Sequence, residues 1–412
     1  MLAKLNIDAV LQETTIHRRR QTLSAIARGL GLGDAYDATL GRIKGQGGDK
    51  AKLGILALMW ISHAERPLKV DELCHALAVE IGSPSLNTDN VPSIGTLLAC
   101  CQGLVVVEKE TSMVRLIHFT LQEYLRAHPN LFSAAHSTMA DTCLSYLNSQ
   151  QIKALSTSPS PDLQNTPFLK YSSLYWGTHA KRDLPESTKR FALELLDDCE
   201  NSMPTKILLQ AQGIYGRAVD FDKSSLFSGL HYASFFGIDE IVAGLVQMDD
   251  CDVNQLDCGG KTPLVWAAGN GHEGVVKILL RQDDVDPDKP DDFGLTPLMS
   301  AAFGGHEGVV KILLARDDVD PNKPDILGQT PLLWAASKGY EGVVKILLAR
   351  DDVIPDKPDD KNQTPLLWAA SKGHEGVVKM LLARDDINPD KPDNSGLTPL
   401  PGAAPEYYFA YK

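Results

Sequence analysis

The chain has 412 residues, 43% of them hydrophobic and 23% charged, and a formal net charge of −13 at pH 7. These are the proportions of an ordinary soluble globular protein, and the length suggests two to four domains. No secretory leader follows Met1, and the longest apolar run, Leu53 to Ile61, is too short to span a bilayer. We therefore expect neither a secreted nor a membrane protein.

The acidic charge is confined to one half of the chain. Basic and acidic side chains balance in residues 1–225, so the net charge of −13 belongs to residues 226–412. Such a field attracts basic partners and disfavours nucleic acid. Seven cysteines without Cys-x-x-Cys spacing predict free thiols in a reducing compartment. We expect a cytoplasmic protein, and the cluster Arg18–Arg20 is either a solvated helix face or a nuclear signal.

Residues 1–50 are predicted to be helical, with one helix from Asn6 to Ala27. Two glycine-rich stretches follow, at 29–33 and 45–50. The first has no strand before it, and the second lacks Gly-Lys followed by Ser or Thr, so neither fits a phosphate-binding loop. We interpret the second stretch as a flexible joint.

Residues 51–128 show the element order of a winged helix, which is three helices and then a β-hairpin. The helices are expected at 53–63, 71–81 and 93–101, and the strands at 104–107 and 113–117. Winged helices often bind DNA through the third helix. Here that helix contains no Arg or Lys and the hairpin tip is Glu108-Lys109-Glu110, which argues against DNA binding.

Residues 129–222 are predicted to form a helical linker. Its helices are expected at 136–147, 168–181, 186–200 and 205–218, with a Ser/Pro-rich loop at 156–166. An aromatic stripe of Phe168, Tyr171, Tyr175 and Trp176 could form a ligand slot, but packing in a core is the preferred interpretation. We expect the linker to be a rigid coupling that covers the apolar face of the first repeat.

The second half contains one unit repeated at a fixed period. Thr-Pro-Leu begins at Thr262, Thr296, Thr330, Thr364 and Thr398, at intervals of 34 residues. Thr330 is the expected N-cap of a first helix, Pro331 its first residue and Gly339 its stop. A second helix and a connector rich in Pro, Asp and Lys follow. Asn362 stands where other copies have glycine, and we predict a positive φ there.

This unit resembles the ankyrin repeat. The likeness is carried by Asp-x-x-Gly-x-Thr-Pro-Leu, then Ala-Ala, then Gly-His-Glu-x-Val-Val-Lys-x-Leu-Leu, as in residues 291–314. It implies about five repeats at 223–400, the last incomplete, and an irregular tail at 401–412. The period is one residue longer than usual, and the histidine after Thr-Pro-Leu survives only as His231 in a degenerate first copy. The predicted fold class is mainly α, with a winged-helix module, a helical linker and an ankyrin-repeat solenoid.

The first half resembles the winged helix downstream of the NACHT domain in fungal signal-transduction NTPases, and the similar module of GPI inositol-deacylase-like proteins. The resemblance spans about residues 10–185 and is most specific in Val114 to Leu125. In related switch NTPases a histidine near this place senses bound nucleotide. The resemblance makes His118 the candidate nucleotide sensor here, provided that an NTPase core is supplied, although a histidine bracing the strand-to-helix corner is the preferred interpretation.

The chain lacks the sequence motifs of both associated enzymes. It contains neither Gly-x-x-x-x-Gly-Lys-[Ser/Thr] nor Gly-x-Ser-x-Gly. We therefore expect no catalytic residues, no cofactor and no enzyme activity, and residues 1–50 would be the helical remnant of the region following a NACHT domain. The resemblance implies a truncated family member, a degraded paralogue or an incomplete gene model.

Positions that differ between the repeats indicate which surface binds a ligand. The second helices are nearly identical, whereas the turn tips and the ends of the first helices vary. The candidate protein-binding residues are Lys261, Phe293, Leu295, Phe303, Ile326, Leu327, Lys338, Lys361, Asn362 and Lys372. Among them Phe293, Ile326 and Leu327 are the expected apolar anchors. The recurring Trp266, Trp334 and Trp368 either reach this face or, as we prefer, pack between repeats.

The connectors between the repeats contain several aspartates, which are common ligands of metal ions. Asp284-Val285-Asp286-Pro287-Asp288 begins like a calcium loop, but it lacks the glycine at position six and the glutamate at position twelve. We interpret the recurring aspartates as solvated loop residues and expect no metal.

The predicted function is a non-enzymatic protein–protein interaction or scaffold module. Its repeats would bind a protein partner, with a preference for basic ones, through the concave face, in a signalling or innate-immunity-like context. The first alternative is a regulatory fragment of a nucleotide-driven switch that docks on an NTPase core, within the molecule or in trans. The second is DNA binding by the winged helix.

Overall fold

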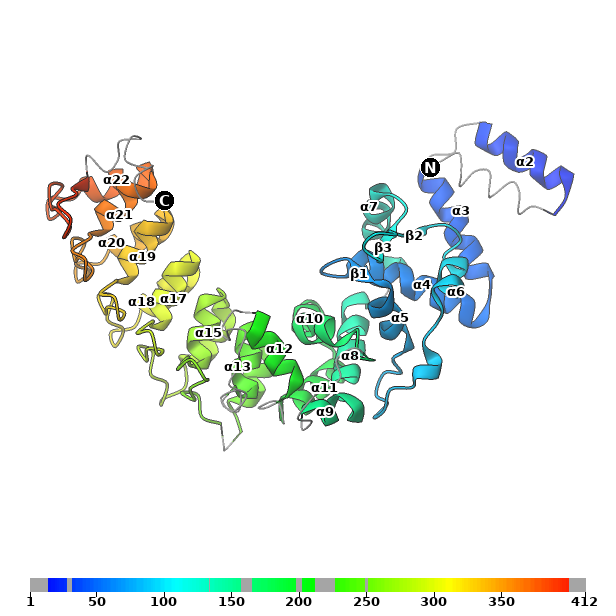
Figure 1. The fold of residues 1–412 in the computed structure, drawn as a ribbon, viewed down its shortest axis with the longest axis horizontal. Coiled ribbons are helices and arrows are strands. Elements are labelled where there is room, and N and C mark those ends of the chain that lie inside the picture. The colour runs from blue at the N-terminus through cyan, green and yellow to red at the C-terminus, as the bar shows by residue number, and fades with distance from the viewer. Residues whose placement is uncertain are drawn as a thin grey trace. The chain divides into compact units, whose positions relative to one another are not determined.

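The computed structural model describes residues 14–27, 32–132, 134–156, 165–197, 202–211, 227–248 and 251–399. The chain divides into two compact units, Met1–Leu195 with Ser202–Leu208, and Leu196–Asn201 with Leu209–Lys412. Figure 1 shows that nearly all its elements are helices. The predicted fold class, mainly α with a winged helix, a helical linker and a repeat solenoid, is confirmed.

The first unit begins with two helices, α2 (Ile16–Ala27) and α3 (Leu32–Gly45). The elements of the winged helix follow, and they are α4 (Gly48–His63), β1 (Leu68–Lys69), α5 (Val70–Ala78), η1 (Thr88–Asn90), α6 (Ile94–Cys100), β2 (Val105–Val107), β3 (Met113–Leu116) and α7 (Phe119–Ala127). The three strands form an antiparallel sheet in the order β1-β3-β2. The predicted hairpin is therefore present, and the sequence analysis missed β1, which is only two residues long.

Two details of the predicted first unit need correction, and a third falls only partly within the described residues. The second helix is α5, which begins at Val70 and ends at Ala78, so Ile81 does not line it and is 48% exposed. The expected joint at 45–50 is shorter, because α3 continues to Gly45 and α4 begins at Gly48. Only the later part of the helix expected from Asn6 is described, as α2; residues 1–13 lie outside the described residues.

The linker is a set of helices around an aromatic core. Its elements are η2 (Pro129–Leu131), α8 (Ala135–Leu147), α9 (Gln150–Ser156), α10 (Leu169–Arg182), α11 (Glu186–Asp197) and α12 (Met203–Ala211). Phe168, Tyr171 and Trp176 are fully buried, and Trp60 of α4 meets the rings of Phe168 and Tyr171 edge-on at 5.5 and 5.9 Å. Core packing of the aromatic stripe, the preferred interpretation, is confirmed.

Three histidines meet where α4, α8 and α10 pack together. His136 Nδ1 lies 3.0 Å from His179 Nδ1, and the His63 and His136 ring centroids are 5.5 Å apart. His179 Nε2 lies 2.9 Å from the hydroxyl of Tyr171. Burial lowers the pKa of all three histidines, that of His179 to about 3, and the nearby Arg182 charge acts in the same direction. The three rings are therefore neutral at pH 7.

The packing of α4 against α3 and α6 depends on Gly54. A Cβ at this position would lie 2.8 Å from the carbonyl oxygen of Cys100 and 2.9 Å from Cγ2 of Ile43. Both neighbours are buried. The helices consequently approach at a distance that only glycine permits.

Substitution of Gly54 by alanine should destabilise the first unit. The added methyl group overpacks a backbone contact, and the expected loss of unfolding free energy is about 1–3 kcal/mol. Gly41, exposed in α3 with nothing within 4 Å of an added Cβ, is the matched control. Gly41→Ala should instead stabilise by about 0.5–1 kcal/mol, because alanine is the better helix former. Urea unfolding measures both, and equal effects of the two substitutions would contradict the close approach.

The second unit is a stack of helix pairs that follow one another in chain order (Figure 1, green to orange). The helices are α13 (Gly229–Phe236), α14 (Asp239–Leu245), α15 (Pro263–Gly269), α16 (Glu273–Leu279), α17 (Pro297–Gly304), α18 (Glu307–Leu314), α19 (Pro331–Lys338), α20 (Glu341–Leu348), α21 (Pro365–Lys372) and α22 (Glu375–Leu382). Each first helix packs on the next first helix, and each second helix on the next second helix. Buried alanine pairs such as Ala335 and Ala336 permit this close stacking.

The predicted end signals of the repeat helices are present. Thr330 Oγ1 accepts a hydrogen bond from Leu333 N at 3.2 Å, and Pro331 is the first residue of α19. Gly339 ends α19 with φ 75°. Asn362 has φ 62°, as predicted, and its side-chain amide donates to Pro392 O at 2.6 Å. The amide therefore fastens one repeat to the next.

The connectors are also fastened from repeat to repeat. Arg316 pairs with Asp318 at 2.6 Å and donates to Leu280 O of the preceding repeat at 2.8 Å. Lys323 Nζ donates to Asp288 O at 2.7 Å. The same two links recur in the following repeats. Charged groups on this edge of the stack thus serve its cohesion.

Candidate protein-binding face

The turn tips of the repeats form a continuous backbone ladder. We define the tips as residues 258–261, 292–295, 326–329 and 360–363. Ile326 N donates to Phe293 O at 3.0 Å, and Asp360 N donates to Leu327 O at 3.0 Å. Adjacent tips are thereby held in register, so their side chains stand in fixed relative positions.

An aspartate sets the shape of each tip. In the tip at 326–329, Asp325 Oδ1 accepts hydrogen bonds from Leu327 N and Gln329 N, both at 2.9 Å. Its other oxygen, Oδ2, accepts a hydrogen bond from Trp334 Nε1 at 3.1 Å. Asp257 and Asp359 receive the same tryptophan hydrogen bond in their repeats. This carboxylate turns the backbone and ties the tip to the first helix.

Three large apolar side chains project from two adjacent tips. Phe293 is 59% exposed, Ile326 60% and Leu327 56%. The Phe293 and Ile326 backbones are hydrogen-bonded and Leu327 follows Ile326, so the three side chains start from neighbouring positions, and we call them the apolar tip patch. The exposed Asp292 precedes Phe293, and the backbone of the exposed Asp360 donates a hydrogen bond to Leu327 O. Exposed apolar side chains gathered in this way are typical of a surface that another molecule covers.

Aromatic rings and lysines extend the face over the first helices. The Phe303 and Trp334 rings meet edge-on with centroids 5.1 Å apart, and Lys338 Nζ lies 4.4 Å from the Phe303 centroid. Lys261 lies over Trp266 at 4.8 Å, and Lys372 lies over Trp368 at 5.7 Å. We call the tips and these first-helix side chains together the tip face. In three places on the tip face, a lysine ammonium group lies close to an aromatic ring.

The structure places the ten predicted residues on this face with unequal exposure. Phe293, Phe303, Ile326, Leu327, Lys338, Lys361 and Lys372 are exposed, whereas Lys261, Leu295 and Asn362 are half-buried. Asn362 has a structural bond of its own, described above. Trp266 is buried and Trp334 and Trp368 are half-buried, and packing between repeats is confirmed for Trp266 and Trp334 through their ring partners. The role of the ten residues in binding stays a prediction.

Sequence analysis missed Phe235. This half-buried ring meets Trp266 edge-on at 5.5 Å, in the same way that Phe303 meets Trp334. Phe235 lies seven residues after the N-cap Ser228, as Phe303 lies seven after Thr296. An alignment of the degenerate first copy on its own cap residue would have found it.

The winged helix offers less to a ligand. The His118 side chain is the N-cap of α7, where its Nδ1 accepts from Thr120 N at 3.3 Å. This geometry braces the strand-to-helix corner, and a nucleotide-sensing role stays a prediction. At the hairpin tip Glu108 pairs with Arg115 at 3.2 Å.

The described part of the chain contains neither a cluster of metal-ligating side chains nor a membrane-spanning helix. Within it, no group of three or more His, Cys, Asp or Glu side chains is arranged to hold a metal ion. Connector aspartates instead accept hydrogen bonds from backbone amides, as Asp288 Oδ2 does from Asp320 N at 2.7 Å. None of the described helices has the length and apolar character needed to cross a bilayer.

Comparison with known families agrees with this architecture. Residues 230–325 and 317–393 match the model for ankyrin repeats (3 copies). Residues 41–136 match the model for the GPI inositol-deacylase winged helix domain. The chain thus contains a winged helix domain of that type followed by ankyrin repeats. No curated protein matches it.

The histidine expected after Thr-Pro-Leu in an ankyrin repeat has a structural role in the first copy. His231 is buried, and its Nδ1 accepts from Ser228 N at 3.1 Å. Its Nε2 lies 3.0 Å from Gln255 O and 3.1 Å from Lys261 O, which links the first repeat to the next tip. Later copies replace the histidine by Val265, Met299, Leu333 and Leu367, all buried. Their tips are held by the aspartates and the ladder described above.

Proposed function

We propose that this protein is a non-enzymatic interaction module whose ankyrin repeats bind a protein through the tip face. The apolar tip patch is the observation that carries the proposal. Its three side chains are each more than half exposed and occupy positions where the other tips have small, polar or charged residues. When a partner covers such side chains, the buried apolar area stabilises the complex by roughly 25 cal/mol per Å².

The electrostatics of the repeats support a partner with basic residues around an apolar segment. Residues 226–412 carry the whole net charge of −13, which accelerates the approach of a basic protein. Asp292 and Asp360, which adjoin the apolar tip patch, would meet basic side chains of the partner directly. The lysine ammonium groups that lie over aromatic rings of the tip face could also bind an acidic or carbonyl group of the partner near the first helices.

The first unit supports a regulatory context for this binding. We propose, from its resemblance to the winged helix that follows NACHT domains, that it belongs to a fungal signalling protein acting in the cytoplasm. In one form of this proposal, residues 1–225 dock on an NTPase core and His118 lies near the nucleotide. Partner binding by the repeats would then depend on the nucleotide state of that core. DNA binding has no specific observation in its favour, since α6 carries no basic residue.

Affinity capture with the full chain tests the proposal. The bait is compared with the triple variant Phe293→Ala, Ile326→Ala, Leu327→Ala, and with a matched double variant, Ile354→Ala, Leu382→Ala. Ile354 and Leu382 are 51% and 42% exposed in the same unit but lie outside the tips. A specific partner should be retained by the wild type and the double variant and lost by the triple variant. A partner retained equally by all three would refute binding at the tip face.

A further inference from the structure

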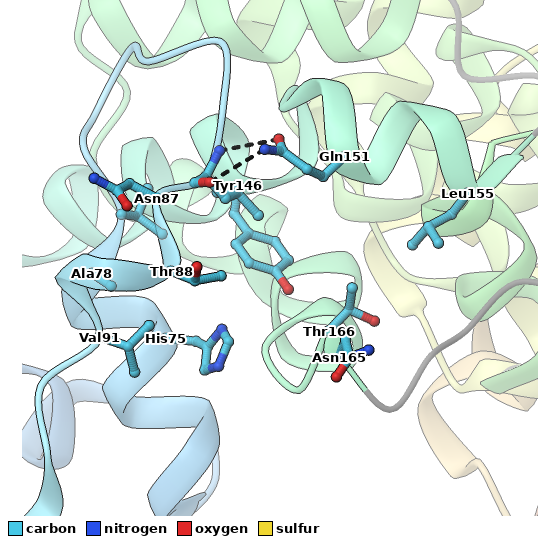
Figure 2. Close-up of a pocket in the computed structure, with 12 residues that line it drawn as sticks. His75, Ala78, Asn87, Thr88, Val91, Tyr146, Gln151, Leu155, Asn165 and Thr166 are labelled. Carbon is cyan, nitrogen blue, oxygen red and sulfur yellow. Dashed lines mark hydrogen bonds between the residues drawn. The ribbon is translucent and has the colours of Figure 1, made fainter.

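A pocket of about 400 Å³ lies inside the first unit, between the winged helix and the linker. One wall is α5 with the loop at 86–91, and the other is the end of α8, α9 and residues 165–166 (Figure 2). Its lining residues are His75, Ala78, Val79, Leu86, Asn87, Thr88, Val91, Tyr146, Gln151, Leu155, Asn165 and Thr166. The volume falls within the range of small-molecule sites in proteins, roughly 300–1,000 Å³.

Hydrogen bonds fix the two walls of the pocket to each other. Gln151 Oε1 accepts from Leu86 N at 3.0 Å, and Gln151 Nε2 donates to Leu86 O at 3.2 Å (Figure 2). Gln150 N donates to Pro84 O at 2.9 Å. The glutamine side chain thus pairs with the loop backbone as a neighbouring strand would. These hydrogen bonds fix the position of α9 relative to the loop, and so they fix the two walls of the pocket relative to each other.

Tyr146 brings an unused hydrogen-bonding group to this pocket. The side chain is 1% exposed, its ring packs edge-on against Phe168 at 5.2 Å, and its hydroxyl has no hydrogen-bond partner within the described structure. Figure 2 shows the ring directed between His75 and Thr166. A buried hydroxyl without a partner is destabilising, because it has lost its hydrogen bonds to water without replacing them. A ligand that supplies an acceptor would relieve this cost.

The chemistry of the lining restricts the ligand. Among the described residues, no Asp, Glu, Lys or Arg lines the pocket, and burial lowers the pKa of His75, so that its half-buried ring is neutral at pH 7. Charged ligands would lose their hydration without gaining an ion pair. Ala78, Val79, Leu86, Val91 and Leu155 supply apolar walls.

We propose that this pocket binds a neutral, mainly apolar small molecule that carries a carbonyl-type acceptor for the Tyr146 hydroxyl. The hydroxyl oxygen is covered by the side chains around it, so the acceptor reaches it when a lining side chain rotates. This site is separate from the tip face and does not depend on the function proposed for the repeats.

Two probes of equal shape test the proposal on the full chain. Acetophenone has a carbonyl oxygen where α-methylstyrene has a methylene group. Ligand-observed NMR titration should show acetophenone binding about threefold to tenfold more tightly, as expected for one neutral hydrogen bond. In Tyr146→Phe this preference should disappear while the hydrocarbon still binds. Ala78→Trp, which fills the pocket, should abolish binding of both probes.

Three outcomes would overturn the proposal. They are the absence of binding of either probe to the wild type, a preference for acetophenone that persists in Tyr146→Phe, and undiminished binding in a folded Ala78→Trp. Tyr146→Phe removes only an unpartnered oxygen, so it should fold like the wild type and keeps the test decisive even where Ala78→Trp fails to fold. Melting curves of both variants establish which case applies.

Discussion

Joint replacement of Phe293, Ile326 and Leu327 by alanine should weaken partner binding by about a hundredfold or more. A few buried apolar or aromatic anchors dominate most interfaces, with about 2 kcal/mol or more for each, and about 1.4 kcal/mol corresponds to a factor of ten. The three side chains are exposed, so their removal opens no core cavity and stability should change little. Isothermal titration of the captured partner against the wild type and the variant measures the effect.

Single substitutions refine this expectation. Phe293→Ala should cost the most, because the ring is the largest of the three side chains and lies beside Ile326 on the ladder. The control Ile354→Ala, Leu382→Ala should bind within about twofold of the wild type. If the control weakened binding as much as the triple variant does, the partner would not be using the tips.

Acid should destabilise the first unit through its buried histidines. A histidine with pKa 6.5 in the unfolded chain and a lower pKa in the folded one contributes stability that is fully present above pH 6.5 and is lost as pH falls toward the folded pKa. For His179, with a folded pKa of about 3, the loss between pH 7.5 and pH 5 is about 2 kcal/mol. His63 and His136 act in the same direction.

The variant His179→Gln isolates this effect. Glutamine can still hydrogen-bond to Tyr171 but does not titrate, so the variant should be less stable at pH 7.5 and much less sensitive to acid. Asp141, whose pKa burial raises, opposes the effect but is present in both proteins. Hydrogen exchange of α8 and α10 between pH 7.5 and 5, corrected for intrinsic rates, provides the local measurement. Equal pH sensitivity in the two proteins would show that His179 is already charged at pH 5.

The repeats were predictable from sequence because their signals are local. Thr330, Pro331 and Gly339 act on the helix that contains or adjoins them, so a cap, a first residue and a stop can be assigned without knowing the packing. The positive φ of Asn362 followed from the glycines at equivalent positions in other copies. The exposure of Phe293, Ile326 and Leu327 was predictable from the variation between the tips.

Other features depend on contacts between distant segments. The strand β1 has two residues, too few for an alternating pattern, and exists because Leu68 and Lys69 pair with Val114 and Met113. The seven-residue helix α9 has no clear apolar period. Pairing of His136 with His179 joins helices 43 residues apart in sequence. Sequence patterns within a single helix or strand cannot predict such long-range contacts.

The candidate site was predicted only in part for the same reason. The apolar tip patch could be found by comparing tip sequences. The stacking of Lys338 on Phe303, and of Phe303 on Trp334, crosses from one repeat to the next and needs the helix spacing of the folded stack. The hydroxyl of Tyr146 gives no sequence signal, because an unpartnered donor is visible only once its surroundings are known.

If the proposed function is right, a protein partner covers the tip face. Hydrogen–deuterium exchange of the full chain with and without its captured partner measures this coverage. We expect slower exchange at the tips 292–295, 326–329 and 360–363 and at α17 and α19, with the connectors at 317–325 and 351–358 unchanged. Slower exchange confined to residues 51–131, with the tips unaffected, would contradict it and place the interface on the winged helix.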